Sequence, residues 1–586
     1  MERLYKKSNS EKIITLDKMW DFRVDPENKG KDEAWFSSFP EDSRKMVVPS
    51  CWNMELDLFR YIGTAWYHTT FETESENIYV KFSSVNNEAD VYLDGKHLGN
   101  HYGAFLEFGY EVTGLSKGKH ELVVRVNNSS NDIDTYPLTD VDWYNYGGIA
   151  RCVDIYELSD ARLSDLKITY AIENDYKDVR VSVNAKLKTY KEIEDDIEIY
   201  INDELKYKER IKLDGEKNIE VSDILIENAK LWGIFKPNLY YIKVKFGNED
   251  LIERTGFREI KTNHMDILLN GEKIKLLGIN RHEIHPDWGF TMPFNLIKKD
   301  IDIIKNLNCN AVRTSHYPNA QITADYCDEI GMLFWEELPL WGRPECAMVT
   351  ELTKARVLPM IGEMINAGFN HPSIVIISMH NECATDTNGG YEFTKMMMEK
   401  ARSLDNNRLF THVTNRGGDA HPDICYELDD IICMNKYIGW YEGVETGDWN
   451  AFIERWEKHI EACNSGDKPR LMTEFGAGAI PGVNTFEAQR WSEDYQADYL
   501  EFTLNQLLSN AKISGTYIWQ YCDSHIPFGR ELARPRSFNN KGIVDEYRRP
   551  KRAYRVVQKI YGKEMGEGAH FDRARINNYS LPKWEY

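Results

Sequence analysis

The chain has 586 residues, of which 42% are hydrophobic and 12% aromatic, so it is too long for one core and too apolar for a disordered polymer. Its formal net charge is −22, which excludes the basic surface that a nucleic-acid partner requires. The first residues lack an apolar run of signal-peptide length, and no later run is long enough to cross a bilayer. We therefore expect a cytoplasmic protein with no membrane partner.

Residues 1–258 are predicted to be all-β. Short runs rich in Val, Tyr, Phe and Thr alternate with turn signals such as Asp94-Gly95 and Asn127-Asn128. No amphipathic helix of convincing length interrupts them. The pattern predicts two β-sandwiches, one over residues 1–158 and one over residues 159–258.

From residue 259 onward, continuous apolar runs alternate with helix-like segments. The runs cover residues 274–279, 311–315, 333–336, 374–379, 409–413, 431–435, 470–474 and 515–520. The helix-like segments include residues 296–306, 352–367, 391–403, 449–462 and 487–509. Apolar strands alternating with helices indicate a parallel sheet covered on both faces. Eight such units over residues 259–586 predict a (β/α)8 barrel, with a doubly wound open sheet as the alternative.

Two glutamates end apolar runs of this predicted barrel. Glu382 follows the fourth run and Glu474 ends the seventh, so both would lie at the carboxyl ends of strands, where barrel enzymes carry their catalytic groups. A pair of carboxylates suits retaining glycoside hydrolysis, in which they stand roughly 5–5.5 Å apart. Glu382 would be the protonated acid and Glu474 the ionised nucleophile, surrounded by hydrogen-bond donors. The alternative is that each glutamate pairs with an arginine at the barrel rim.

Three segments carry a resemblance to a known family. Residues 310–318 (Asn-Ala-Val-Arg-Thr-Ser-His-Tyr-Pro), 380–382 (His-Asn-Glu) and 473–476 (Thr-Glu-Phe-Gly) are similar to signatures of glycoside hydrolase family 2. The resemblance implies a jelly-roll domain, an immunoglobulin-like sandwich and a catalytic barrel, in that order. It also implies retaining exo-hydrolysis of a β-linked sugar, contact of Asn381 with the 2-hydroxyl, and a dimer or tetramer.

The sugar is indicated by residues that follow the eighth run. The sequence Asn539-Asn540-Lys541 resembles the Asn-x-Lys motif of the bacterial β-glucuronidases in this family. A carboxylate that leaves water needs a cation and a neutral donor, and Lys541 with Asn539 would supply both. Alone, such a motif in a polar loop is commonly a turn. The resemblance implies a small-molecule β-D-glucuronide as substrate. Relatives acting on β-galactosides or β-galacturonides, and a non-catalytic carbohydrate-binding protein, remain alternatives.

The resemblance assigns roles to further residues, each of which could otherwise be a core or rim residue. It implies that Tyr437 orients Glu474 and that Tyr441 faces the uronate end of the sugar. Three more residues would complete the site: Asp142 for sugar hydroxyls, His316 for a hydroxyl, and Trp519 as a hydrophobic floor.

Two departures from the family pattern affect the predicted site. The better-known glucuronidases carry an arginine four residues before the Asn of the motif, where this chain has Pro535 between Arg534 and Arg536. Either arginine could take that place, or the carboxylate could rest on Lys541, Asn539 and Tyr441; of these, we expect Arg536. The stretch over residues 341–351 is short, where relatives often insert a loop over the aglycone, so an open mouth that admits larger glucuronides is predicted.

The sequence also argues against metal and cofactor sites. The ten cysteines are scattered without a Cys-x-x-Cys pair, which predicts reduced thiols. Residues 282–285 (His-Glu-Ile-His) lack the spacing of the His-Glu-x-x-His zinc motif. No phosphate-binding or dinucleotide-binding glycine loop is present. We expect neither a metal nor a cofactor, and leave open a ligand such as a flavin away from the barrel.

Overall fold

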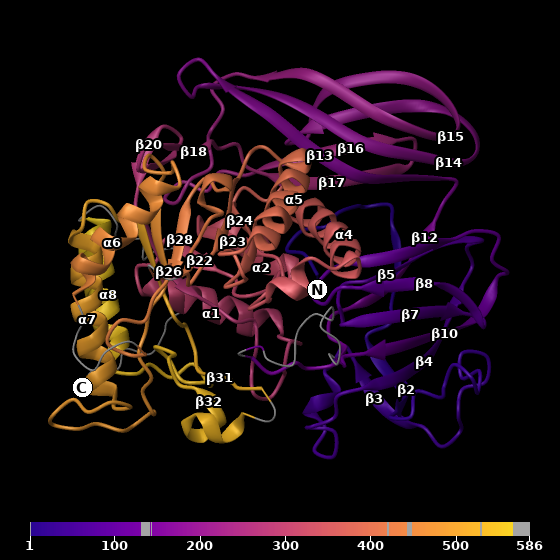
Figure 1. Cartoon of the computed structure of the whole chain (residues 1–586). Helices are drawn as coiled ribbons and strands as arrows, with labels where there is room; N and C mark the ends of the chain where they lie inside the picture. The colour runs from indigo at the N-terminus through magenta and orange to yellow at the C-terminus, as the bar shows by residue number, and fades with distance from the viewer. Residues whose placement is uncertain are drawn as a thin grey trace, which may run out of the picture.

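The computed structural model describes residues 2–129, 141, 143–418, 421–441, 448–527 and 530–566. Two β-domains and a barrel follow one another along the chain, and the second β-domain projects above the other two in Figure 1. This architecture confirms the predicted fold class.

The first domain packs two antiparallel sheets around one core. Apolar and polar residues alternate along its strands, so that Ile78, Val80 and Phe82 are fully buried while their neighbours face outward. One sheet contains β1 (Lys12–Thr15), β12 (Val153–Leu158), β5 (Asn77–Phe82) and β9 (Phe108–Val112). The other contains β3 (Arg44–Val48), β2 (Lys18–Asp25), β4 (Thr64–Thr73), β10 (Gly118–Asn127), β7 (Glu88–Leu93) and β8 (Lys96–Tyr102).

The second domain is built around a long antiparallel hairpin of β14 (Asp178–Ile201) and β15 (Glu204–Ile226). The first half of β14 pairs with β13 (Ala161–Glu173), whereas its second half pairs with β16 (Tyr240–Phe246). Shifts of register between these halves let the strand bend and serve two partners. The remaining strand, β17 (Glu249–Thr255), lies beside β16 and beside the N-terminal segment of the chain.

The third domain is a closed barrel of eight parallel strands. Their order in space follows their order in the chain, and the Thr414–Met434 bridge joins the fifth strand to the sixth. All eight predicted runs are strands of this barrel. They are β21 (Leu276–Asn280), β22 (Ala311–Arg313), β23 (Leu333–Glu337), β24 (Ile374–Asn381), β25 (Leu409–Val413), β28 (Ile432–Asn435), β29 (Arg470–Glu474) and β30 (Gly515–Ile518).

Helices cover the outside of the barrel (Figure 1). They are α1 (Phe294–Asn306), α2 (Gln321–Ile330), α3 (Glu345–Met348), α4 (Glu351–Gly368), α5 (Asn388–Leu404), α6 (Trp449–Ala462), α7 (Glu493–Ser509) and α8 (Ala553–Met565). The sequence did not indicate α2, whose Thr, Asp and Cys residues have modest helix propensity and whose apolar face is buried by packing. Helix α7 begins six residues later than predicted, because Ser492 caps it by accepting a hydrogen bond from the Tyr495 amide.

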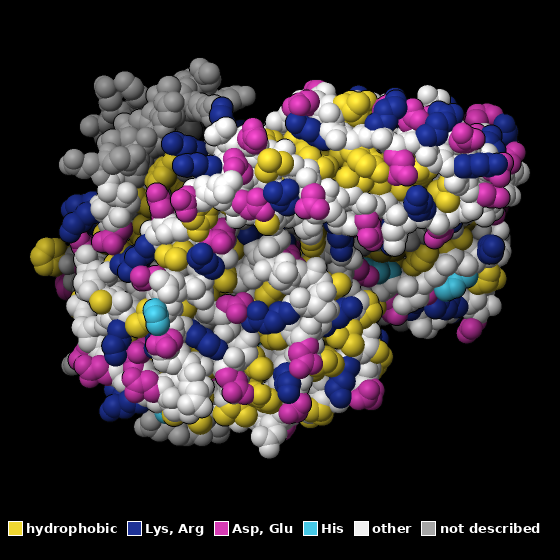
Figure 2. Space-filling model, turned by 90° about the horizontal axis from the view of Figure 1, so that it is seen from above, with side chains coloured by type: hydrophobic (Ala, Val, Ile, Leu, Met, Phe, Trp, Pro, Cys, Tyr) yellow, Lys and Arg dark blue, Asp and Glu magenta, His cyan; other side chains and the backbone are white. Residues whose placement is uncertain are grey.

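Charged side chains of both signs are spread over the surface of the molecule. On the face seen in Figure 2, acidic and basic side chains of the described residues are interspersed and do not gather by sign. No helix in the described part of the chain has the length and apolar character that a membrane span requires.

Candidate active site

Arg313, at the end of β22, is the centre of a buried network inside the barrel mouth. Its guanidinium donates to Glu474 Oε1 at 2.9 Å, to Asn381 Oδ1 at 2.9 Å and to Glu337 Oε2 at 2.8 Å. The side chain is fully enclosed. Since the three acceptors end β29, β24 and β23, one cation fixes the carboxyl ends of several strands against each other.

Glu474 receives donors on both carboxylate oxygens. Arg313 donates to Oε1, and the Tyr437 hydroxyl donates to Oε2 at 2.8 Å. His316 Nε2 lies 3.9 Å from Oε1, and the other ring nitrogen of His316 is 2.6 Å from Glu337. The site therefore has the donors that were expected around an ionised carboxylate.

Glu382 follows β24 at the same barrel mouth. Its backbone adopts a positive φ of 55°, and the Asn435 side-chain amide donates to its Oε1 at 2.9 Å. The same amide donates to Asn381 Oδ1 at 3.0 Å, which is also an acceptor of Arg313. Asn435 and Asn381 thus link the surroundings of Glu382 to those of Glu474.

The two carboxyls interact electrostatically. Burial raises the pKa of Glu474 to about 8, the Arg313 guanidinium opposes this rise, and the charge of Glu382 adds to it. Glu474 is buried and Glu382 is only partly buried, so the two carboxyls differ in their surroundings. A pair of neighbouring carboxyl groups is the arrangement that glycoside hydrolysis requires.

A cationic corner adjoins the carboxyl pair. Lys541, only 4% exposed, donates to the Tyr441 hydroxyl at 2.6 Å, and the Tyr441 ring contacts the Tyr437 ring at a centroid distance of 5.2 Å. A small cavity of about 130 Å³ opens here, and Tyr441, Arg534, Asn539 and Lys541 contribute to its wall. Such a volume suits a carboxylate with its first water molecules.

The two arginines beside Pro535 have different surroundings. Arg536 pairs with Glu546 and approaches Asp523 at 3.6 Å, away from the wall of the small cavity. Arg534 lines that cavity and donates to the Tyr441 hydroxyl at 3.4 Å. Between the two, the geometry favours Arg534, where Arg536 was expected.

Aromatic rings line the floor of the mouth. Trp519 stacks on His316 at a centroid distance of 5.1 Å, and Trp143 of the first domain approaches His316 at 5.6 Å. The first domain therefore contributes side chains to the barrel mouth. Asp142, the residue predicted to contact sugar hydroxyls, lies outside the described residues.

Arg313, Glu337 and Asn435 are residues of the site that were not predicted from the sequence. Glu337 directly follows an apolar run and Asn435 ends one, so the rule that found the glutamates also applies to them, whereas Arg313 lies inside the run over residues 311–315. Arg313 was noted only as part of a family signature. The sequence does not show which of these strand ends contact each other in the folded barrel.

The site and its surroundings offer few candidate metal ligands. Asp325, Asp328 and His371 form the one group of three close potential ligands among the described residues. Asp325 already accepts from Arg3 at 2.8 Å and lies 3.5 Å from Arg254, while Asp328 lies 2.6 Å from His371. This group lies outside the barrel mouth, and its charges are balanced by arginine, as in a structural ion-pair network.

Three family models match the chain. They are the family 2 glycosyl hydrolase sugar-binding domain over residues 13–159, a further family 2 glycosyl hydrolase domain over residues 161–258, and the family 2 TIM barrel domain over residues 259–565. Together they cover most of the chain, in the order that the fold shows.

Named relatives agree with these models. A β-glucuronidase of Paenibacillus borealis is 27% identical, over 95% of this chain and 97% of its own length. A solved β-galacturonidase of Eisenbergiella tayi bound to galacturonate is 35% identical, with a TM-score of 0.88 over 96% of this chain and 99% of its own. The β-glucuronidase of an uncultured Clostridium is 26% identical, with a TM-score of 0.85 over 96% and 99%. The chain therefore belongs to glycosyl hydrolase family 2 and is a glycoside hydrolase.

Proposed function

We propose that the chain is a retaining exo-β-uronidase whose first candidate substrates are β-D-glucuronides. The observation that carries the proposal is the buried Lys541 with Tyr441 and Arg534, beside the Glu382–Glu474 pair. A neutral hexose offers no charge to compensate a buried ammonium group, whereas the carboxylate at C5 of a uronide does. The β-glucuronidases among the relatives support the same substrate class.

In the proposed mechanism, Glu474 is the nucleophile. Arg313 and Tyr437 donate to its two oxygens and oppose the rise in its pKa that burial causes, so they favour the ionised form that attack requires, and Glu382 is assigned as the acid. Glu382 protonates the glycosidic oxygen while Glu474 attacks the anomeric carbon, which gives a covalent glycosyl-enzyme and a free aglycone. Glu382 then takes a proton from water, which displaces Glu474 and releases the uronate with its configuration retained.

Asn381 and Lys541 hold the two ends of the sugar in this proposal. The side chain of Asn381, fixed by Arg313 and Asn435, is assigned to the 2-hydroxyl, a contact that strengthens in the transition state. Lys541, Asn539, Tyr441 and Arg534 bind the carboxylate at the opposite end of the ring. His316 and Trp519 form the wall between them.

The test compares kcat/KM for p-nitrophenyl β-D-glucuronide, galacturonide, glucoside and galactoside. Wild type is expected to prefer a uronide over its neutral partner by at least about 100-fold. Lys541→Met should cost roughly 100-fold or more on the uronides and little on the neutral glycosides. Lys559→Met, on the exposed face of α8, is the matched control and should resemble wild type. Equal turnover of a neutral glycoside by wild type would refute the proposal.

A β-D-galacturonide is the second candidate substrate. The observation that favours it is the 35% identity with the galacturonidase of Eisenbergiella tayi, against 24–29% for relatives named as β-glucuronidases or putative β-glucuronidases. Both uronides present the same carboxylate to Lys541 and differ only in the orientation of the 4-hydroxyl. The ratio of kcat/KM between these two substrates therefore decides the sugar, while the comparison with neutral glycosides decides the class.

A further inference from the structure

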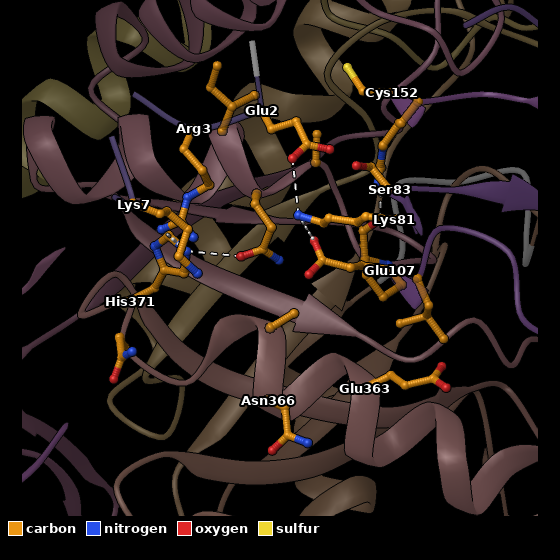
Figure 3. Close-up of a pocket in the computed structure, with 18 of the residues that line it drawn as sticks. Glu2, Arg3, Lys7, Lys81, Ser83, Glu107, Cys152, Glu363, Asn366 and His371 are labelled. Atoms are coloured by element: carbon orange, nitrogen blue, oxygen red, sulfur yellow. Dashed lines mark hydrogen bonds and ion pairs between the residues drawn. The ribbon is translucent and has the colours of Figure 1, made fainter. Parts of the chain in front are cut away.

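A second and larger cavity lies outside the barrel, between the three domains. Its volume is about 960 Å³, which lies in the range of small-molecule sites. Figure 3 shows its wall: Arg3 and Lys7 of the N-terminal segment, Lys81 and Glu107 of the first domain, and Glu363 of α4. It is distinct from the barrel mouth, because Glu337 faces inward to Arg313 whereas its neighbour Glu336 faces outward into this cavity.

The cations around this cavity already have partners. Lys81 contacts Glu2 at 3.1 Å and Glu107 at 2.9 Å, as Figure 3 shows. Lys7 pairs with Glu253 at 2.5 Å, and Arg151 pairs with Glu283 at 3.1 Å. Arg3, Lys167 and Lys186 are bound to Asp325, Asn366 and Asp165, respectively. The wall therefore holds no cation that needs an anionic ligand.

Glu336 shares an enclosed oxygen without a hydrogen-bond partner, in the part of the chain that the structure describes, with Glu2 of the same wall, but only Glu2 is paired with a lysine, Lys81, through its second oxygen. Glu336 is 2% exposed, and its Oε2 is enclosed without a hydrogen-bond partner among the described residues. The absence of a side chain at Gly368 leaves room for this oxygen against α4. A buried carboxyl with an unsatisfied oxygen costs free energy, and a cation bound at the cavity side of Glu336 would stabilise its charge.

The rest of the cavity provides apolar contact. Phe105, Leu106, Phe290 and Met364 are buried residues of its wall, and Phe294 packs beside them. Trp288, which is half exposed, also contributes to the wall. The acids of the wall outnumber its cations, and Glu336 lies beside this apolar part, so the cavity favours a ligand with an apolar body and one cationic group.

We propose that this interdomain cavity binds a small organic amine with an aromatic or aliphatic body, whose ammonium group pairs with Glu336. The site lies apart from the sugar site and does not depend on which glycoside is hydrolysed. The ammonium group pairs with the Glu336 carboxylate from the cavity side, and the body replaces water against the phenylalanine and methionine side chains.

The probe is phenethylamine, and 2-phenylethanol of similar shape is the neutral control. Calorimetric titration of the full chain is expected to show that the amine binds at least about tenfold more tightly than the alcohol. Glu336→Gln should abolish this preference. Glu363→Gln, on the same wall but paired with His101 of the first domain, should keep it.

The pH dependence gives a second readout that needs no variant. Burial raises the pKa of Glu336 to about 8, against the opposing charges of Arg151 and Arg408, so the amine must displace a proton to form the ion pair. Its affinity should rise roughly tenfold per pH unit up to about pH 8 and level off above. Glu336→Gln keeps the other titratable groups of this wall, among them Glu283, Glu363 and His371, and should show a flat profile.

Three results would overturn the proposal. They are equal affinity for the amine and the alcohol, an affinity of the amine that does not change between pH 6 and 8, and undiminished binding by Glu336→Gln. Each would mean that water alone satisfies Glu336. Because glycoside turnover is measured separately with Glu474 intact, failure here leaves the proposed uronidase activity untouched.

Discussion

At the residue scale, the proposed mechanism depends on Glu474 being ionised when the substrate is bound. Glu474 accepts from Arg313 and from Tyr437, whereas Asn435 donates to Glu382. A cation and a hydroxyl stabilise a negative charge on Glu474, which supports its proposed role as the nucleophile. The identity of the two glutamates was predictable from their places after apolar runs, but these donors were not.

Removing the Tyr437 hydroxyl tests this proposed role. The hydrogen bond from Tyr437 lowers the pKa of Glu474, so Tyr437→Phe should raise it and move the acid limb of kcat/KM to higher pH. We expect kcat to fall roughly 10- to 100-fold, the cost of one donor to a charged group. Tyr391→Phe, on α5 at the barrel surface, is the matched control for loss of a tyrosine hydroxyl. An unshifted acid limb would remove Tyr437 from its role.

At the scale of elements, strand ends decide which residues meet. The eight apolar runs were sufficient to predict the barrel, because each buried strand carries its own hydrophobic signal. The two arginines after the eighth strand lie outside the hydrophobic pattern that predicts the strands. Arg534 and Arg536 lie in a polar loop without periodicity, so their partners, Tyr441 and Glu546, depend on the tertiary structure.

The loop after β29 approaches β30 so closely that it requires glycine at residue 476. A side-chain carbon there would lie 2.0 Å from the Trp519 carbonyl oxygen. Gly476→Ala should therefore lower the free energy of unfolding by about 2 kcal/mol or more and displace Trp519 and Lys541, with loss of kcat/KM. Gly362→Ala in α4, where the added carbon meets nothing within 4 Å, should be neutral or slightly stabilising. Chemical denaturation compares the two, and a wild-type profile for Gly476→Ala would contradict the predicted overlap.

At the scale of the whole molecule, the N-terminal segment connects the three domains. Glu2 pairs with Lys81 of the first domain, Tyr5 donates to Glu253 of the second, and Arg3 binds Asp325 of the barrel. No sequence pattern indicated these contacts, because a short charged segment has no hydrophobic periodicity from which its partners could be predicted. The sequence predicted the order of the domains and left their packing open.

Loss of one of these contacts should weaken the association of the domains. Arg3→Met leaves Asp325 buried without its closest cation, so the apparent Tm should fall by several degrees and the calorimetric transition should broaden as the domains unfold less cooperatively. Lys6→Met, at an exposed position of the same segment, is the control. Identical scans for the two variants would show that the segment does not join the domains.

The central claim is that Glu474 forms a covalent bond to a uronic acid during turnover. A 2-deoxy-2-fluoro-β-D-glucuronyl fluoride reacts through its good leaving group, while the 2-fluoro group slows hydrolysis, so the intermediate should accumulate. Peptide mass spectrometry after labelling is predicted to find one uronosyl adduct, on Glu474, from this reagent or its galacturonyl epimer and not from the neutral glucosyl analogue. An adduct on another residue, equal labelling by the neutral analogue, or turnover of uronides without any adduct would contradict the account.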